Sequence, residues 1–309
     1  MNSDQQNLNL FEPEPDSGSD SGPTPPAPPV IVTPAEWPAP IESPVAPLAP
    51  PRFSPTLPED LRVPWDWWDL ALMVLIGFGA LVVFGMFLGA QLHKAGITKE
   101  QFEQSGIDQA QFAIYAMFGL STVLLLYLFA QMRLRFHAPF WRTMRWHPLD
   151  SGKLRPGVAY LGFVAGGFLL SILVALASSA FSPKHKMPIE QYFQDRHTAL
   201  LLLIMSVTVA PFFEETIFRG YLYPVVARSF GVAPGIILTG LLFGLMHSSQ
   251  LGGNLPQVAL IVVVGIVFTA ARAKTGNVLP GYLLHVSYNS FIAMAFLIAS
   301  HGLRHMPPA

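Results

Sequence analysis

Seven apolar runs follow one another from residue 68 to residue 300, and shorter polar stretches separate them. They cover residues 68–92, 109–132, 156–181, 198–228, 232–249, 256–272 and 278–300. A helix of about 20 apolar residues spans the hydrocarbon core of a bilayer, and each run reaches or approaches that length. The pattern therefore predicts an all-α, polytopic helical membrane protein with about seven transmembrane helices.

The fourth and sixth runs depart from the average length. As one straight helix, residues 198–228 would extend over about 45 Å, which exceeds the thickness of the hydrocarbon core. Pro211 lies inside this run, and a proline in a helix interior removes a hydrogen bond and bends the helix. We therefore expect a kink near Pro211. The sixth run, residues 256–272, is the shortest of the seven.

Composition narrows the class of protein and its partners. The chain is 51% hydrophobic and 12% charged, whereas soluble domains carry about 25% charged residues. The formal net charge of −1 lacks the basic footprint of a nucleic-acid binder. The expected partners are therefore membrane lipids, with no nucleic acid. The chain has no cysteine, which excludes disulfides, zinc–thiolate sites and a cysteine nucleophile.

Proline divides the chain into an N-terminal tail and a membrane part. Residues 1–64 hold 17 of the 29 prolines. Such a segment favours extended polyproline II conformations and buries too little apolar surface to fold. We expect a disordered Pro-rich tail at 1–64, N-terminal transmembrane helices and loops at 65–197, and a membrane core at 198–300.

The basic residues between the runs predict the orientation. The segment 133–156 carries six basic residues and one acidic residue, which places it on the cytoplasmic side by the positive-inside rule. With seven crossings the N-terminal tail is cytoplasmic and the C-terminus external. A re-entrant fourth or fifth run would invert the C-terminal half, and this alternative stays open.

Two adjacent carboxylates and an arginine interrupt the fourth apolar run. They are Glu214, Glu215 and Arg219. Each ionisable group near the bilayer centre costs roughly 2.5–3.5 kcal/mol on insertion scales, so such a cluster indicates a functional site. Glu215 and Arg219 are four residues apart and share a helix face, where they can pair. Glu214 points about 100° away from Glu215 in an α-helix and must find another partner.

One further polar residue and one polar pair follow in the later runs. His247 ends an apolar run, and His285 and Asn289 lie four residues apart on one face of the last run. Alone, His247 also fits a hydrogen-bonded interior histidine, and His285 with Asn289 also fits polar side chains that join transmembrane helices. The positions of Glu214, His247, His285 and Asn289 within their runs allow all four to meet within the bilayer core.

Together these side chains could hydrolyse an amide. A carboxylate with a histidine can deprotonate water, and a histidine with an asparagine amide can stabilise the oxyanion that forms on the attacked carbonyl. Zinc is a second alternative, because Glu214, His247 and His285 are ligand types for Zn²⁺. The His-Glu-x-x-His motif is absent, so no cofactor is certain and metal binding stays open.

The order of the motifs resembles the CPBP (ABI) family of intramembrane proteases. The motifs are Glu214-Glu215-x-x-x-Arg219, Phe243-x-x-x-His247 and His285-x-x-x-Asn289. This family includes type II CAAX prenyl proteases and bacterial proteins similar to lysostaphin resistance protein A. The resemblance implies an endopeptidase acting on prenylated (CAAX-type) proteins or bacterial peptides.

The resemblance also implies a role for each residue. Glu214 activates the water and His247 helps to orient or deprotonate it. His285 and Asn289 form the oxyanion hole. The pair of Glu215 and Arg219 supports the site structurally.

Two other functions stay open on the sequence. A catalytically inactive scaffold or immunity-type protein would keep the motifs without the chemistry. A proton-coupled transporter would use the same carboxylates, but the repeat symmetry usual in transporters is not evident. The expected location is a bacterial inner (plasma) membrane.

Overall fold

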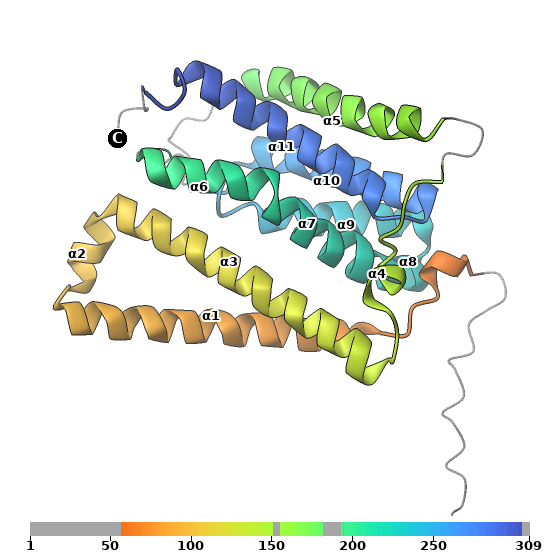
Figure 1. Cartoon of the computed structure of the whole chain (residues 1–309), viewed down its shortest axis with the longest axis horizontal. Coiled ribbons are helices and arrows are strands. Elements are labelled where there is room, and N and C mark those ends of the chain that lie inside the picture. Colours follow the sequence, from red (N-terminus) through yellow and green to blue (C-terminus); the bar gives the residue numbers. More distant parts are fainter. Residues whose placement is uncertain (1–56, 151–154, 182–192, 194, 305–309) are drawn as a thin grey trace, which may run out of the picture. The chain divides into compact units, whose positions relative to one another are not determined.

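The computed structural model describes residues 57–150, 155–181, 193 and 195–304 of the 309-residue chain (Figure 1). These residues form helices and connections without any strand, which confirms the all-α prediction. The short elements η2 and η4 are π-helices and η1 is a 3-10 helix. The elements are η1 (Glu59–Leu61), α1 (Trp67–Ala95), α2 (Lys99–Gln104), α3 (Gly106–Ala130), η2 (Gln131–Arg135), α4 (Phe140–Thr143), α5 (Pro156–Ser179), α6 (Arg196–Val207), α7 (Val209–Glu215), η4 (Thr216–Leu222), α8 (Tyr223–Phe230), α9 (Val232–Met246), α10 (Leu255–Thr275) and α11 (Leu279–Ala299).

Six helical segments of the described residues are long and apolar enough to cross a membrane, and α9 is a shorter apolar helix. The prediction of about seven spans is confirmed in this form. The prediction that the sixth run is the shortest is wrong. Its helix, α10, has 21 residues, whereas α9 in the fifth run has 15. The fifth run was expected to continue to residue 249, but turns follow Met246. Gly252 and Gly253 in these turns have φ of 60° and 69°, a left-handed conformation that glycine adopts without steric cost.

The fourth span is broken into several helices. α6 ends at Val207 and α7 begins at Val209, with Thr208 between them at φ −114° and ψ −72°; Figure 1 shows the bend. Pro211 lacks an N–H, and its ring would clash with the carbonyl of Val207 in a continuous helix. The predicted kink is therefore confirmed. Beyond Glu215 the chain continues as the π-helix η4, a form that is frequent at functional sites.

Glycines bring α9 into direct contact with α10. A Cβ added at Gly244 would lie 2.8 Å from the backbone nitrogen of Val262, and one at Gly240 would lie 2.7 Å from that of Ile266. Both distances are too short for real side chains, so only glycine fits. Small residues four apart are the usual means by which transmembrane helices approach closely. This contact fixes the helix that carries Phe243 and His247.

Residues 57–66, which we call the N-terminal strap, precede α1 and pack into the fold. Leu61, Val63 and Trp65 are buried, and Leu61 packs against Tyr223 of α8. The predicted disordered tail of residues 1–64 therefore extends too far along the chain. Buried apolar side chains at every second position hold residues 57–64 against the fold. The rest of the predicted tail, residues 1–56, lies outside the described residues.

The strap also shows how the helix ends are arranged. Arg228 near the end of α8 donates a 2.8 Å hydrogen bond to the carbonyl of Val63. Arg272 near the end of α10 pairs with Asp60 at 2.7 Å. The start of the first span and the ends of the fourth and sixth spans thus lie together. This agrees with the seven-crossing alternative and not with an inverted C-terminal half.

Candidate active site

Glu215 and Arg219 form a buried ion pair, as their spacing predicted. Arg219 Nη1 lies 2.8 Å from Glu215 Oε1, and both side chains have no exposed surface. The guanidinium also donates to Thr269 Oγ1 at 3.2 Å and to the carbonyl of Gly265 at 2.9 Å, both on α10. We call this pair the Glu215–Arg219 brace, because it joins the fourth span to α10.

Aromatic rings and one glycine complete the surroundings of the brace. The guanidinium carbon of Arg219 lies 4.4 Å from the ring centre of Phe243 and 5.4 Å from that of Phe268. Such contacts stabilise a buried cation. On the other side, a Cβ at Gly281 would lie 2.5 Å from Glu215 Oε2. The first residue of the Phe-x-x-x-His motif is thus a partner of the arginine, and Gly281 leaves room for the carboxylate.

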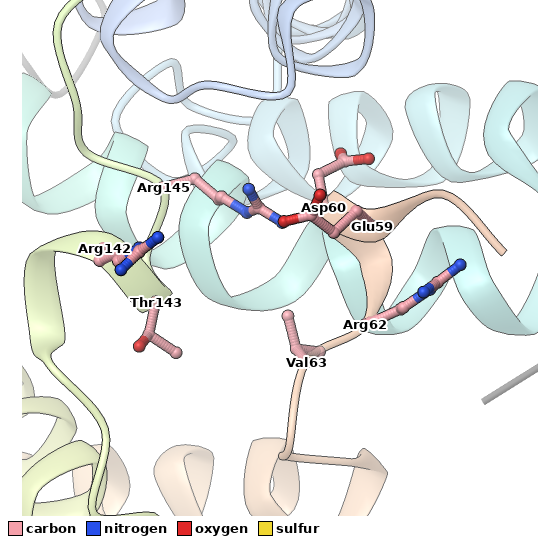
Figure 2. Close-up of a pocket in the computed structure, with 7 residues that line it drawn as sticks. All are labelled: Glu59, Asp60, Arg62, Val63, Arg142, Thr143 and Arg145. Atoms are coloured by element: carbon pink, nitrogen blue, oxygen red, sulfur yellow. The ribbon is translucent and has the colours of Figure 1, made fainter. Parts of the chain in front are cut away.

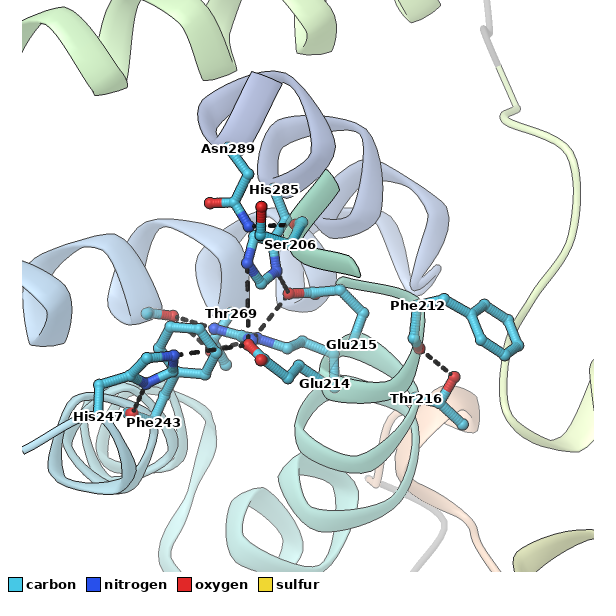
Figure 3. A network of polar contacts seen from close by, with 12 residues as sticks. Ser206, Phe212, Glu214, Glu215, Thr216, Phe243, His247, Thr269, His285 and Asn289 are labelled. Atoms are coloured by element: carbon cyan, nitrogen blue, oxygen red, sulfur yellow. Dashed lines mark hydrogen bonds and ion pairs between the residues drawn. The ribbon is translucent and has the colours of Figure 1, made fainter. Parts of the chain in front are cut away.

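Glu214 lies between the two histidines of the motifs (Figure 3). Its Oε2 is 3.8 Å from Nε2 of His247 and 3.8 Å from Nε2 of His285. These distances exceed those of direct hydrogen bonds. Glu214 Oε2 is buried and accepts no hydrogen bond from any described residue. Three of the four side chains predicted to meet, Glu214, His247 and His285, therefore lie together.

The hydrogen bonds of the two imidazole rings orient both Nε2 atoms toward Glu214. His247 Nδ1 lies 2.8 Å from the carbonyl of Phe243. A carbonyl only accepts, so this nitrogen carries the hydrogen. His285 Nδ1 lies 3.0 Å from Glu215 Oε1 and donates to that carboxylate. His285 therefore connects the brace to Glu214.

Asn289 lies one helical turn beyond His285 and has a different partner. Its Nδ2 donates to the carbonyl of Ser206 at 2.7 Å. Ser206 is in the last turn of α6, where carbonyls lack partners within the helix. Asn289 thus joins α11 to the broken end of α6. An amide nitrogen carries two hydrogens, so this bond leaves a second N–H for another acceptor.

Exposure differs between the two halves of the cluster. The side chains of His247 and Glu214 are 21% and 15% exposed, against 6% for His285 and none for the brace. His247 also directly follows α9, as its C-cap residue. The half of the cluster formed by Glu214 and His247 is therefore partly exposed, and the half around Arg219 is closed.

The donor set does not match a metal site. Glu214, His247 and His285 are of suitable types, but within the described part of the chain no group of three or more His, Cys, Asp or Glu side chains is arranged to hold a metal ion.

Several site residues were not expected from the sequence. Thr269 and Gly265 bind Arg219, Gly281 makes space for Glu215, and Ser206 binds Asn289. A small or polar residue in an apolar helix is the signal they share, but it does not identify the partner. These contacts depend on how the helices rotate against one another, which spacing along one helix does not determine.

Comparison with known proteins finds a family model that covers the part of the chain with the motifs. Residues 196–291 match the family model described as "Type II CAAX prenyl endopeptidase Rce1-like". An Escherichia coli protein described as "Uncharacterized 24.3 kDa protein" is 32% identical over 125 residues, 39% of this chain and 54% of that protein.

The chain thus spans about half the length of the curated relative it matches. No solved structure matches the chain. The matched residues 196–291 hold all three motifs, and six helices are long and apolar enough to cross a membrane. The resemblance to the CPBP (ABI) family is therefore confirmed, and the chain is an integral membrane protein with an Rce1-like segment at residues 196–291.

Proposed function

We propose that this protein is an intramembrane endopeptidase in which Glu214 activates the water that hydrolyses a peptide bond. The observation that carries the proposal is the position of Glu214 Oε2, 3.8 Å from Nε2 of both His247 and His285. This oxygen is an acceptor without a donor among the described residues, and such groups in a protein interior require a partner. The similarity to a protease family supports the same reaction class.

In the proposed reaction the attacking water contacts both the Glu214 carboxylate and His247. It donates one hydrogen bond to the carboxylate and one to the lone pair of His247 Nε2, since the hydrogen of that ring is held on Nδ1 by the Phe243 carbonyl. The water oxygen attacks the peptide carbonyl carbon while Glu214 takes its proton. Glu214 then gives this proton to the leaving nitrogen as the C–N bond breaks. The products are a carboxylic acid and an amine.

His285 and Asn289 are the proposed donors to the oxyanion. His285 donates from Nε2 when both of its nitrogens carry hydrogen, and Glu215 compensates the resulting positive charge through the 3.0 Å contact at Nδ1. Asn289 donates the amide hydrogen that is not used by Ser206. Donors fixed in this way need no reorganisation as charge develops, which is the main source of oxyanion stabilisation.

The matching family and the position of the site support a substrate class. The family is described as type II CAAX prenyl endopeptidases, and the cluster lies on helices that are long and apolar enough to cross a membrane or directly beside them. We therefore include prenylated CAAX-type proteins and bacterial membrane peptides as substrates. We also propose that the protein resides in a bacterial inner membrane.

The test is cleavage of a peptide library by the purified protein in detergent, with and without a chelator. Glu214→Gln should lower kcat at least 10²-fold, the lower range for loss of a general base. Glu100→Gln, which removes an exposed carboxylate from α2, is the matched control and should retain full activity. Activity should persist with the chelator.

Two results would contradict the proposal. Full cleavage by Glu214→Gln would remove the carboxylate from the reaction. Absence of cleavage by the parent protein on prenylated and unprenylated peptides would favour the inactive scaffold.

A further inference from the structure

Two side chains from outside η4 hold its backbone. Arg272 Nε donates to the carbonyl of Arg219 at 3.2 Å, and Trp65 Nε1 donates to the carbonyl of Tyr221 at 2.8 Å. Both donors are fully buried. Carbonyls in such a segment need partners inside the protein, because lipid offers none. The backbone that carries the arginine of the brace is thus held by α10 and by the N-terminal strap.

Asp60 of the strap extends this chain of contacts. Its Oδ2 lies 2.7 Å from Arg272 Nη1, and its carbonyl lies 3.4 Å from Nη2. Arg272 is fully buried whereas Asp60 is 18% exposed. The carboxylate compensates the buried charge and sets the direction in which the guanidinium presents Nε to Arg219. From there the contacts run through Glu215 to His285, which faces Glu214.

The strap is fixed at several further points. Arg228 donates to the carbonyls of Val63 and Trp65, and the Trp65 ring stacks on Tyr221 with centroids 5.0 Å apart. On its outer side, a polar pocket of about 200 Å³ separates the strap from α4 and Arg145 (Figure 2). The strap therefore has one face against η4 and one face toward this pocket.

We propose that Asp60 and Trp65 are positioning residues for the active site: the strap sets the geometry of η4 and, through Arg219 and Glu215, the position of His285. The proposal rests on the proposed function for its catalytic consequence. It assigns to residues outside the matched segment 196–291 a part in the reaction, although neither residue touches the reacting atoms.

The central experiment compares Asp60→Asn with two matched variants. Asp60→Asn keeps the shape and removes the charge, and we expect kcat to fall about 10-fold per folded molecule with KM unchanged. Asp60→Glu restores the charge and should recover most of the rate. Glu59→Gln changes the neighbouring residue, which is 86% exposed and contacts Arg145 only at 3.5 Å, and should behave as the parent. Thermal unfolding in detergent measures the folded fraction of each variant.

A second readout does not depend on cleavage. Nitrogen-15 NMR of the histidine rings, with His285→Gln used to assign the signal, reports the hydrogen bond of His285 to Glu215. We expect the His285 signal to shift in Asp60→Asn and Trp65→Phe and to stay unchanged in Glu59→Gln.

The outcomes separate the two proposals. If the parent protein cleaves no peptide but the His285 signal shifts in Asp60→Asn and Trp65→Phe, the proposed function is overturned and the positioning role of the strap is supported. An unshifted signal, or an activity loss that only follows the loss of folded protein, would overturn positioning and leave the protease proposal standing.

Discussion

The N-terminal spans and the spans that carry the motifs differ in how much of their surface is covered. In the apolar windows of α1, α3 and α5, between 11% and 22% of the residues are buried, against 28% to 44% in the fourth span, α10 and α11. The ionised brace lies in the covered group, where it has no exposed surface. Charged groups within a membrane are tolerated where protein surrounds them. The comparison shows that the site is shielded from lipid mainly by the helices that contain it.

α5 is the exception that links the two groups. It is the least covered span, yet one face lies directly on α11. A Cβ at Gly167 would lie 2.3 Å from the carbonyl of Leu284, one residue before His285. A helix of the predicted N-terminal part therefore contributes to the position of a motif residue.

The largest stability effect should come from breaking the brace. Glu215→Gln leaves Arg219 buried without its carboxylate, and breaking a buried pair costs about 3–5 kcal/mol. Glu214→Gln should cost less, because no cation lies within hydrogen-bond distance of that carboxylate in the described residues. Thermal unfolding in detergent measures both.

An ion pair in the N-terminal spans provides a comparison that sharpens this prediction. Asp69 of α1 is buried and pairs with Arg135, whose side chain is 56% exposed. Asp69→Asn should destabilise the protein less than Glu215→Gln, because Arg135 can reach solvent. Equal unfolding midpoints for Glu214→Gln and Glu215→Gln would show that the structural and catalytic glutamates are wrongly assigned.

An intermediate effect is expected from adding a methyl group between helices. Gly244→Ala places a Cβ 2.8 Å from a backbone atom of α10, and overpacking of this kind costs about 1–3 kcal/mol. Gly85→Ala on α1 meets nothing within 4 Å and should be neutral or slightly stabilising. Unfolding midpoints in detergent provide the measurement. A similar loss in both variants would contradict the difference between the two groups of helices.

The smallest effect should arise where the fourth span begins. Asp195 caps α6, and hydrogen bonds from the backbone and hydroxyl of Thr198 lower the pKa of its carboxyl group. The contribution of this carboxylate to the free energy of unfolding is therefore complete above its ordinary pKa of about 3.9. It is lost as the pH falls through the lower pKa of the folded state. Asp195→Ala should cost about 1 kcal/mol at neutral pH.

The measurement is unfolding at neutral pH and at a pH below the folded-state pKa. The difference between parent and variant should shrink at the acidic pH. A difference that stays constant would show that the carboxylate does not act as the cap.

The sequence predicted the elements of this structure better than their contacts. Apolar runs located the spans, and the i, i+4 spacing located the pair of Glu215 and Arg219. The sequence did not reveal that His285 binds Glu215 or that Asn289 binds Ser206, because those contacts depend on tertiary packing. The strap was missed because its buried residues alternate within a proline-rich context that resembles the tail before it.

The short α9 has a consequence for the surrounding lipid. A helix of 15 residues is about 22 Å long, whereas the hydrocarbon layer is about 30 Å thick. A bilayer accommodates such a mismatch by thinning locally, at a cost of fractions of a kcal/mol per Å. Thinning would draw the headgroup region toward His247 and, on the proposed function, would shorten the path of a scissile bond from the membrane surface to Glu214.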